Sequence, residues 1–345
     1  MKRSLIFLLF CLFAGFFLAS CTGSGPRPES TVMKVKPVWP PPPAKGRIIW
    51  QQEIKDFSDY RIRQGFWQRL GQLLAGRRKV QMVKPYGVYA DDQGRLFVLD
   101  SGIHRIFMLD RSAGTFRMIP AGDENPLLSP VDLTSDEQGT IYITDSQQGK
   151  IFRYRLDDGK LTEFHTVSLQ RPTGIAYSSR YKQLYVADTL AQQVAVLGLD
   201  GQERFRFGSR GQGSGQFNAP SAISINRRGE LLVTDALNSR VQVFSADGHF
   251  LAQFGRPGDT TGTFAKPKGI AADSDGNIYV CDALFDAVQI FDRHGRLLLA
   301  FGNSGSQPGQ FWMPAGIFID NHDTIYVADT YNRRIQIFRY LKKEK

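Results

Sequence analysis

Aspartate recurs at a near-constant interval along this 345-residue chain, and its carboxylates are the first groups to consider for chemistry. Each ends a short apolar run, and the six positions are Asp100, Asp145, Asp188, Asp235, Asp282 and Asp329. Six carboxylates in a ring could bind a cation. Four of them, however, have a basic residue five positions later, which favours structural ion pairs that brace a turn. These are Asp100 with Arg105, Asp145 with Lys150, Asp235 with Arg240, and Asp329 with Arg334.

Histidine and cysteine show no spacing typical of a metal or catalytic site. The five histidines are scattered over different turns, at His104, His165, His249, His294 and His322. Of the cysteines, Cys11 and Cys21 lie at the N-terminus, and Cys281 lies in an apolar run where two sibling segments have alanine. We therefore expect no disulfide, no bound metal and no cofactor, and a packing role for Cys281.

The aspartates belong to a repeat of 42 to 48 residues that positions them. Each unit has a proline, an apolar strand, a polar turn, a second strand ending in aspartate, another turn and a third strand. The prolines are Pro85, Pro130, Pro172, Pro220, Pro267 and Pro314. The strands are rich in β-branched and aromatic residues, and a period of this length with four short strands is typical of a propeller blade. The sequence predicts an all-β fold with a six-bladed β-propeller over residues 84–338.

The last unit resembles an NHL repeat. Residues 311–338 contain proline, Gly316-Ile317, a strand ending Ala-Asp-Thr, the pair Asn332-Arg333 and a final Ile-Gln-Ile-Phe strand. The resemblance extends over residues 84–338 and is weakest in blades two and three, where Gln147-Gln148 and residues 190–193 replace the Asn and Arg turn. Propellers similar to this one include peptide-amidating lyases, streptogramin lyases and gluconolactonase-like hydrolases. The tryptophan-bearing strand usual in streptogramin lyases is absent from this sequence.

The sixth unit ends after three strands, followed only by a short basic tail at residues 339–345. Residues 46–50 match the fourth strand of the preceding blade at residues 295–299. We therefore predict that an N-terminal strand at residues 46–54 completes the last blade and removes its open edge. Antiparallel order then places the aspartate turns and the links before each proline on one face, which we call the upper face. The turns of Asp-Gly type lie on the lower face.

An insertion at residues 55–83 fits no blade. Phe66, Trp67, Leu70, Leu73 and Leu74 recur at helical spacing, with basic neighbours at Arg61, Arg63, Arg69, Arg77 and Arg78. This pattern predicts a basic amphipathic helix. Three roles stay open: a structural cap on the upper rim, a partner-binding or lid helix over the central channel, or a membrane-surface helix.

The first residues have the basic start, apolar stretch and small residues of a secretory signal, which we assign to residues 1–20. Leu18-Ala19-Ser20-Cys21 resembles the lipobox of bacterial lipoproteins. The resemblance implies a lipid anchor on Cys21 and, with Thr22 in place of aspartate, the outer rather than the inner membrane. Residues 21–45 are proline-rich, and we expect an extended spacer that leaves the lower face and places the membrane on that side.

The formal net charge of +10 suits an anionic lipid, an anionic glycan or an acidic protein, whereas export argues against nucleic acid. Residues that break the repeat on the upper face, together with the helix, are the candidate contacts: Phe66, Trp67, Arg69, Lys266, Lys268, Leu284, Phe285, Trp312, Met313 and Tyr331. We predict a monomeric, non-enzymatic scaffold that binds a protein or glycan in the cell envelope. The alternative is a propeller enzyme, either a metal-dependent lyase or a lactonase-like hydrolase.

Overall fold

The computed structural model describes residues 36–57, 61–62, 80–122, 124–164 and 167–342. The predicted signal peptide, Cys21 and the helix around Phe66, Trp67 and Arg69 lie outside these residues. No helix in the described part of the chain is both long and apolar enough to cross a membrane. The structure below is that of the compact unit that starts at Lys36.

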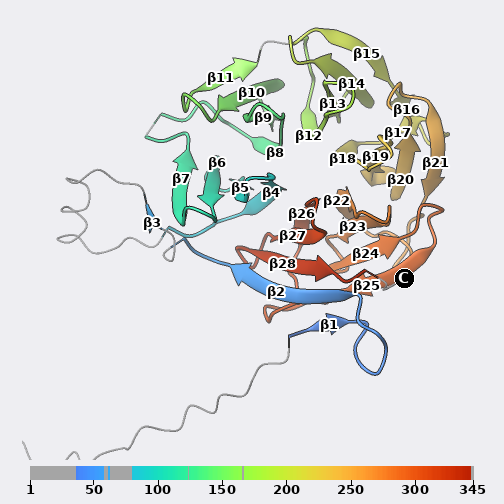
Figure 1. The fold of residues 1–345 in the computed structure, drawn as a ribbon. Coiled ribbons are helices and arrows are strands. Elements are labelled where there is room, and N and C mark those ends of the chain that lie inside the picture. Colours follow the sequence, from blue (N-terminus) through green and yellow to red (C-terminus); the bar gives the residue numbers. More distant parts are fainter. Residues whose placement is uncertain (1–35, 58–60, 63–79, 123, 165–166, 343–345) are drawn as a thin grey trace, which may run out of the picture. The chain divides into compact units, whose positions relative to one another are not determined.

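Six antiparallel sheets are arranged in a ring, which confirms the predicted propeller (Figure 1). Blades 1 to 3 contain β4 (Pro85–Ala90), β5 (Arg95–Asp100), β6 (Arg105–Asp110) and β7 (Thr115–Ile119); β8 (Pro130–Ser135), β9 (Thr140–Asp145), β10 (Lys150–Arg155) and β11 (Leu161–Phe164); and β12 (Pro172–Ser178), β13 (Gln183–Asp188), β14 (Gln193–Gly198) and β15 (Glu203–Phe207). The proline of each repeat starts the innermost strand, and the repeated aspartate ends the second strand.

Blades 4 to 6 contain β18 (Pro220–Ile225), β19 (Leu231–Asp235), β20 (Arg240–Phe244) and β21 (Phe250–Phe254); β22 (Pro267–Ala272), β23 (Ile278–Asp282), β24 (Ala287–Phe291) and β25 (Leu297–Phe301); and β26 (Pro314–Ile319), β27 (Thr324–Asp329), β28 (Arg334–Tyr340) and β2 (Ile48–Ile54). Five small elements remain: β1 (Val38–Trp39), β3 (Arg61–Ile62), β16 (Ser209–Arg210), β17 (Gln216–Phe217) and the 3₁₀ turn η1 (Ala236–Asn238).

The core lies between blades, because the second and third strands of each sheet are covered on both sides. Strands β23 and β24 are buried at every residue. Phe254 and Phe291 illustrate the packing between adjacent blades, with ring centroids 5.0 Å apart. Strands covered on both faces are apolar throughout rather than alternating, which is the pattern that the sequence shows.

The ring closes by pairing the two ends of the propeller, as predicted. Strand β2 is antiparallel to β28, with Ile48 opposite Tyr340 and Ile54 opposite Ile335. The Trp50 indole also donates a 3.0 Å hydrogen bond to the amide oxygen of Gln336. The edge of the last blade is therefore covered by residues from the start of the chain.

The segment before β2 differs from the expected spacer. Strand β1 pairs antiparallel with the start of β2, and the prolines at 40–43 lie in the loop that joins the two strands. Trp39 packs on Phe301 and Phe338, with ring centroids 5.8 and 5.9 Å away. From Val38 onward, the segment expected to be an extended spacer therefore packs on the last blade as one strand of a hairpin with β2.

The described ends of the 55–83 insertion are extended and lie against blade 1. Phe57 stacks on Phe116, with centroids 4.6 Å apart and planes at 12°, and its amide donates to the carbonyl of Val80. Strand β3 is parallel to β7. The insertion leaves β2 where that strand meets the first residues of β28, so it starts at the upper face as expected.

Adjacent innermost strands approach backbone to backbone. The third position of these strands is glycine in four blades, at Gly87, Gly174, Gly269 and Gly316. A Cβ on Gly174 would lie 2.6 Å from the Cα of Ala222 in the next blade, so a side chain there requires the strands to separate. Ala222 takes this position in blade 4 and Asp132 takes it in blade 2.

Candidate functional site

The six repeated aspartates tie the links to the turns on the upper face. All six are fully buried, and each accepts at least one backbone N–H from the link before its proline. Asp100, for example, accepts the amides of Val83 and Lys84 at 2.6 and 2.9 Å. Links and aspartate turns therefore do share one face, and the carboxylates are occupied by structural hydrogen bonds.

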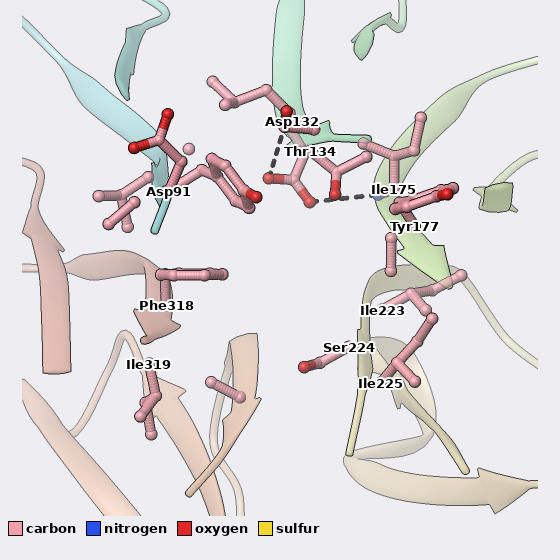
Figure 2. Close-up of a pocket in the computed structure, with 18 of the residues that line it drawn as sticks. Asp91, Asp132, Thr134, Ile175, Tyr177, Ile223, Ser224, Ile225, Phe318 and Ile319 are labelled. Atoms are coloured by element: carbon pink, nitrogen blue, oxygen red, sulfur yellow. Dashed lines mark hydrogen bonds between the residues drawn. The ribbon is translucent and has the colours of Figure 1, made fainter. Parts of the chain in front are cut away.

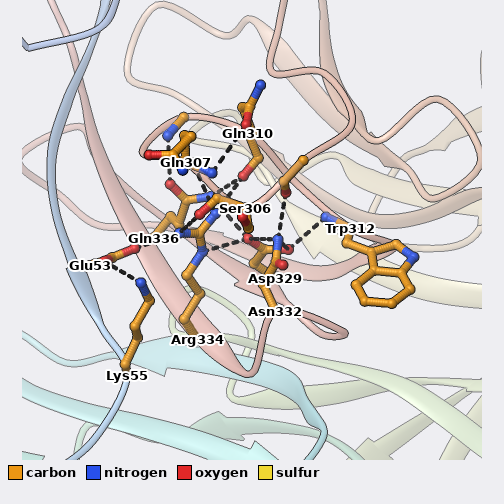
Figure 3. Close-up of polar contacts among 12 residues, drawn as sticks. Glu53, Lys55, Ser306, Gln307, Gln310, Trp312, Asp329, Asn332, Arg334 and Gln336 are labelled. Atoms are coloured by element: carbon orange, nitrogen blue, oxygen red, sulfur yellow. Dashed lines mark hydrogen bonds and ion pairs between the residues drawn. The ribbon is translucent and has the colours of Figure 1, made fainter.

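Two of the expected ion pairs are buried latches, and Figure 3 shows the one between Arg334 and Asp329. The Arg334 guanidinium donates to Asp329 at 2.7 Å and to Glu53 of β2 at 2.5 Å. It also donates to the carbonyls of three residues in the link above it, which are Ser306, Gln307 and Gln310. Burial raises the pKa of the Asp329 carboxyl, while the Trp312 amide, Asn332 and Arg334 oppose that shift. Arg240 and Asp235 form the equivalent latch in blade 4.

The other two expected pairs do not form. Arg105 donates instead to the carbonyl of Pro120, and Lys150 forms an ion pair with Glu163 at 2.7 Å. A latch forms where the backbone of a link folds over the guanidinium, so that the carbonyls of the link accept its hydrogen bonds. Both links that do so contain Gly-Gln-Phe, at residues 215–217 and 309–311. That tripeptide precedes blades 4 and 6 and could have identified the true latches from the sequence.

Exposed apolar side chains gather on the upper face. Four follow a repeated aspartate by two residues and three precede a repeated proline by two residues. We call this set the upper apolar ring: Val83, Leu128, Leu190, Leu237, Leu284, Trp312 and Tyr331. Leu237 and Leu284 are 69% and 59% exposed. The Trp312 and Tyr331 rings lie 5.4 Å apart.

The predicted contact residues are distributed unevenly over this surface. Leu284, Trp312 and Tyr331 belong to the upper apolar ring, and Lys266 is exposed on the neighbouring link. Phe285 and Met313 are partly covered. Lys268 is a correction, because it lines the central channel instead of the upper surface. Sequence reasoning missed four members of the ring, although their position relative to the aspartate or proline was available: Val83, Leu128, Leu190 and Leu237.

The central channel contains a cavity of about 790 Å³. Its walls are the six innermost strands and the turns that follow them on the lower face, and no residue of the upper turns or links lines it. The cavity therefore opens on the lower face. Phe318 forms part of its wall (Figure 2). The Phe318 ring centroid lies 4.8 Å from that of Tyr89, which also lines the cavity.

Asp132 projects into this cavity from β8 (Figure 2). Its carboxylate accepts the amides of Leu133 at 2.9 Å and of Ile175 at 3.2 Å. Its position deep in the ring raises the pKa of the carboxyl to about 7, although the two N–H donors act in the opposite direction. Among the described residues of the innermost strands, no other carboxylate is present.

No group of three or more His, Cys, Asp or Glu side chains among the described residues is arranged to hold a metal ion. His104 lies in an upper turn with a φ of 55°, whereas His249, His294 and His322 are exposed on lower turns. Cys281 is fully buried, and burial raises the pKa of its thiol. This thiol packs between blades and is not poised as a nucleophile.

Two family models match the chain. The model described as SMP-30/Gluconolactonase/LRE-like region matches residues 49–265, and the NHL repeat model matches residues 311–338. No match was found among curated proteins.

Several solved structures share the fold. A streptogramin B lyase has a TM-score of 0.59 at 16% identity, covering 76% of this chain and 95% of that chain. A virginiamycin B lyase from Staphylococcus aureus has a TM-score of 0.57 at 16% identity, covering 84% and 99%. An auxiliary nutrient binding protein from Bacteroides thetaiotaomicron has a TM-score of 0.61 at 16% identity, covering 76% and 70%. At these low sequence identities, the solved structures show a shared fold and nothing more. The SMP-30/Gluconolactonase/LRE-like model, by contrast, matches more than half of the sequence. The chain therefore belongs to the SMP-30/gluconolactonase/LRE-like family, as a six-bladed propeller whose last blade is an NHL repeat.

Proposed function

We propose that this propeller is a non-enzymatic binding scaffold of the bacterial cell envelope, anchored through lipid on Cys21, that engages a protein or glycan partner with its upper face. The observation that carries the proposal is the upper apolar ring. Among the residues that the structure describes, seven of the twelve exposed large apolar side chains belong to it, while the others are scattered over outer strands, a lower turn and the tail. Apolar side chains gathered on one face mark interaction sites, whereas single exposed ones are ordinary.

The composition of this face favours a protein partner over a glycan. Five of the seven members of the ring are leucine or valine, whose side chains offer no flat platform to a sugar. The pair Trp312 and Tyr331 supplies the aromatic residues that dominate protein interfaces. Lys84, Arg171 and Lys266 are exposed on the links between these residues. The partner surface is therefore apolar with an acidic surround.

Site-specific photo-crosslinking in intact cells tests the proposal. A photoreactive residue at Leu237 or Leu284 should yield a discrete adduct with one protein, identified by mass spectrometry. The matched control is Leu251, which is 50% exposed on outer strand β21. Equal adducts from Leu251, or none from the upper positions, would reject the upper face as the binding surface. An adduct with a glycan or with a second copy of the chain would replace the protein partner.

The anchor needs a separate test, since Cys21 lies outside the described residues. Cys21→Ser should abolish incorporation of radiolabelled palmitate and release the protein from the membrane fraction. Thr22→Asp should move the protein from the outer to the inner membrane, if the retention signal operates as the resemblance implies. Normal labelling of the Cys21→Ser variant would exclude this anchor.

A propeller enzyme is the second candidate, and family membership together with the channel cavity favours it. A divalent metal would need several oxygen or nitrogen ligands, whereas the innermost strands offer the carboxylate of Asp132 alone among the described residues. The residues present therefore do not fit a metal centre, and we derive no metal-dependent step. Stoichiometric zinc or calcium in the dialysed protein, lost in Asp132→Asn, would favour the enzyme over the scaffold.

A further inference from the structure

Two side chains from different blades line the upper end of the channel cavity. Lys268 of β22 extends toward Tyr86 of β4, and its ammonium lies 4.9 Å from the centroid of that ring. Blade 6, which lies between these two blades, contributes only Ala315 at the equivalent position. The cavity lining includes Lys268 and Tyr86 but none of the upper links. The cavity therefore belongs to the part of the channel away from the upper apolar ring.

Three polar groups in the cavity lining are without either an opposite charge or a hydrogen-bond partner. The Lys268 ammonium lies over the Tyr86 ring and forms neither a hydrogen bond nor an ion pair with a described residue. Asp132 accepts two backbone amides but pairs with no cation. The buried hydroxyl of Ser221 has no hydrogen-bond partner at all in the described structure.

The surroundings of Lys268 and Asp132 disfavour the charged form of each. Burial lowers the pKa of Lys268 to about 8, and the nearby Lys266 and Lys84 lower it further. The pKa of Asp132 moves in the opposite direction, to about 7. Unpaired charges in such surroundings destabilise the fold, so their presence in a cavity is evidence for a ligand that pairs them.

The two charged residues originate on opposite sides of the ring. Asp132 belongs to blade 2 and Lys268 to blade 5, which are three blades apart in a ring of six. Neither is explained by the repeat, because four other blades have glycine where blade 2 has Asp132, and no other blade has a basic residue at the position of Lys268. A ligand that satisfies both carries a negative and a positive group.

We propose that the cavity binds a small zwitterion, either a free amino acid or a short peptide, through Lys268 and Asp132. The carboxylate of the ligand pairs with Lys268 and accepts the free hydroxyl of Ser221, and its ammonium pairs with Asp132. An apolar side chain then faces the wall of Tyr89, Tyr177 and Phe318 nearer the mouth. The volume of about 790 Å³ leaves room for several residues. This site is independent of the upper face and of any partner bound there.

Calorimetric titration of the full chain in detergent at pH 7.5 tests the site. The probes are L-phenylalanine, Gly-Phe and Gly-Gly-Phe, whose different lengths distinguish an amino acid from a peptide. N-acetyl-phenylalanine lacks the ammonium and phenylalanine amide lacks the carboxylate, so each should bind at least ten-fold more weakly than the matching zwitterion. Absence of binding by all three zwitterions at millimolar concentration, or equal binding of the two blocked compounds, would overturn the proposal.

Substitutions locate the bound probe. Lys268→Met and Asp132→Asn should each weaken binding at least ten-fold, whereas Lys266→Met, which removes an exposed lysine just outside the cavity, should leave it unchanged. Thermal melting checks folding, and both cavity variants should melt no lower than the parent because each removes an unpaired charge. If Asp132→Asn does not fold, Lys268→Met alone decides. Probe affinity unchanged in Lys268→Met would refute the assignment.

Discussion

The Arg334 latch makes the strongest prediction for stability. Its guanidinium is 0% exposed and joins three parts of the chain: Asp329 at the end of β27, Glu53 of the closing strand and the carbonyls of the link over it. Arg334→Met keeps most of the side-chain volume but removes the charge and every one of these hydrogen bonds.

The expected cost follows from what the substitution leaves behind. Removing one partner of a buried ion pair costs about 3–5 kcal/mol, because the remaining charge is buried without compensation. Asp329 retains the amide of Trp312 and the side chains of Asn332 and Gln336, which places the expected loss toward the lower end of that range. Arg105→Met is the matched control at the same position of blade 1. Arg105 donates to one carbonyl, so its loss should cost about 1 kcal/mol.

Urea unfolding of both variants at pH 7, followed by tryptophan fluorescence and circular dichroism, measures the difference in free energy. Arg334→Met should lower the unfolding free energy by at least 2 kcal/mol more than Arg105→Met. A double-mutant cycle with Glu53→Gln should show coupling between blade 6 and the closing strand. If the unfolding free energies of the two arginine variants differ by less than about 0.5 kcal/mol, which is the usual limit of additivity, the latch does not stabilise the ring.

Three further predictions concern the ring and its channel. Deleting residues 47–50 removes three of the six positions of β2 that pair with β28 and should lower the melting temperature, whereas unchanged melting would mean that the ring closes without β2. Gly316→Ala forces a Cβ against the carbonyl of Tyr86 in the next blade and should cost about 1–3 kcal/mol by urea unfolding, while Gly94→Ala, whose Cβ would contact nothing, tests the loss of a left-handed glycine alone. The pKa of Asp132 is raised in the folded protein from 3.8 to about 7, so the native state binds its proton more tightly and stability falls as pH rises from about 4 to 7. This loss of unfolding free energy amounts to at most about 4 kcal/mol. In Asp132→Asn, the unfolding free energy should no longer differ between pH 5 and pH 8 through this group. If the variant shows the same difference as the parent, the raised pKa of Asp132 is contradicted.

The sequence was sufficient for features that repeat. Six copies of proline and aspartate predicted the ring and its upper face, and the match between residues 46–50 and the fourth strand of blade 5 predicted closure by β2. Both rest on spacing and on the alternation of strands, which a single chain displays directly.

Features that occur in a single blade were harder to predict from the sequence. Spacing alone could not separate Arg334 from Arg105, because the difference lies in the links that fold over them. Lys268 was placed on the upper surface because it follows a repeated proline, yet the innermost strand turns it into the channel. Asp132 stands two residues after a repeated proline, where four other blades have glycine, but the sequence did not show that this position faces the channel.

The pairing of β2 with β28 also sets the order in which the molecule can be completed. Residues 48–54 precede their partner at residues 334–340 by about 280 positions, so the ring can close only after every blade between them is available. Until then the edge of β2 is free and blade 6 cannot form. A chain truncated before residue 334 would remain an open arc with two unpaired ends, open to proteases and chaperones.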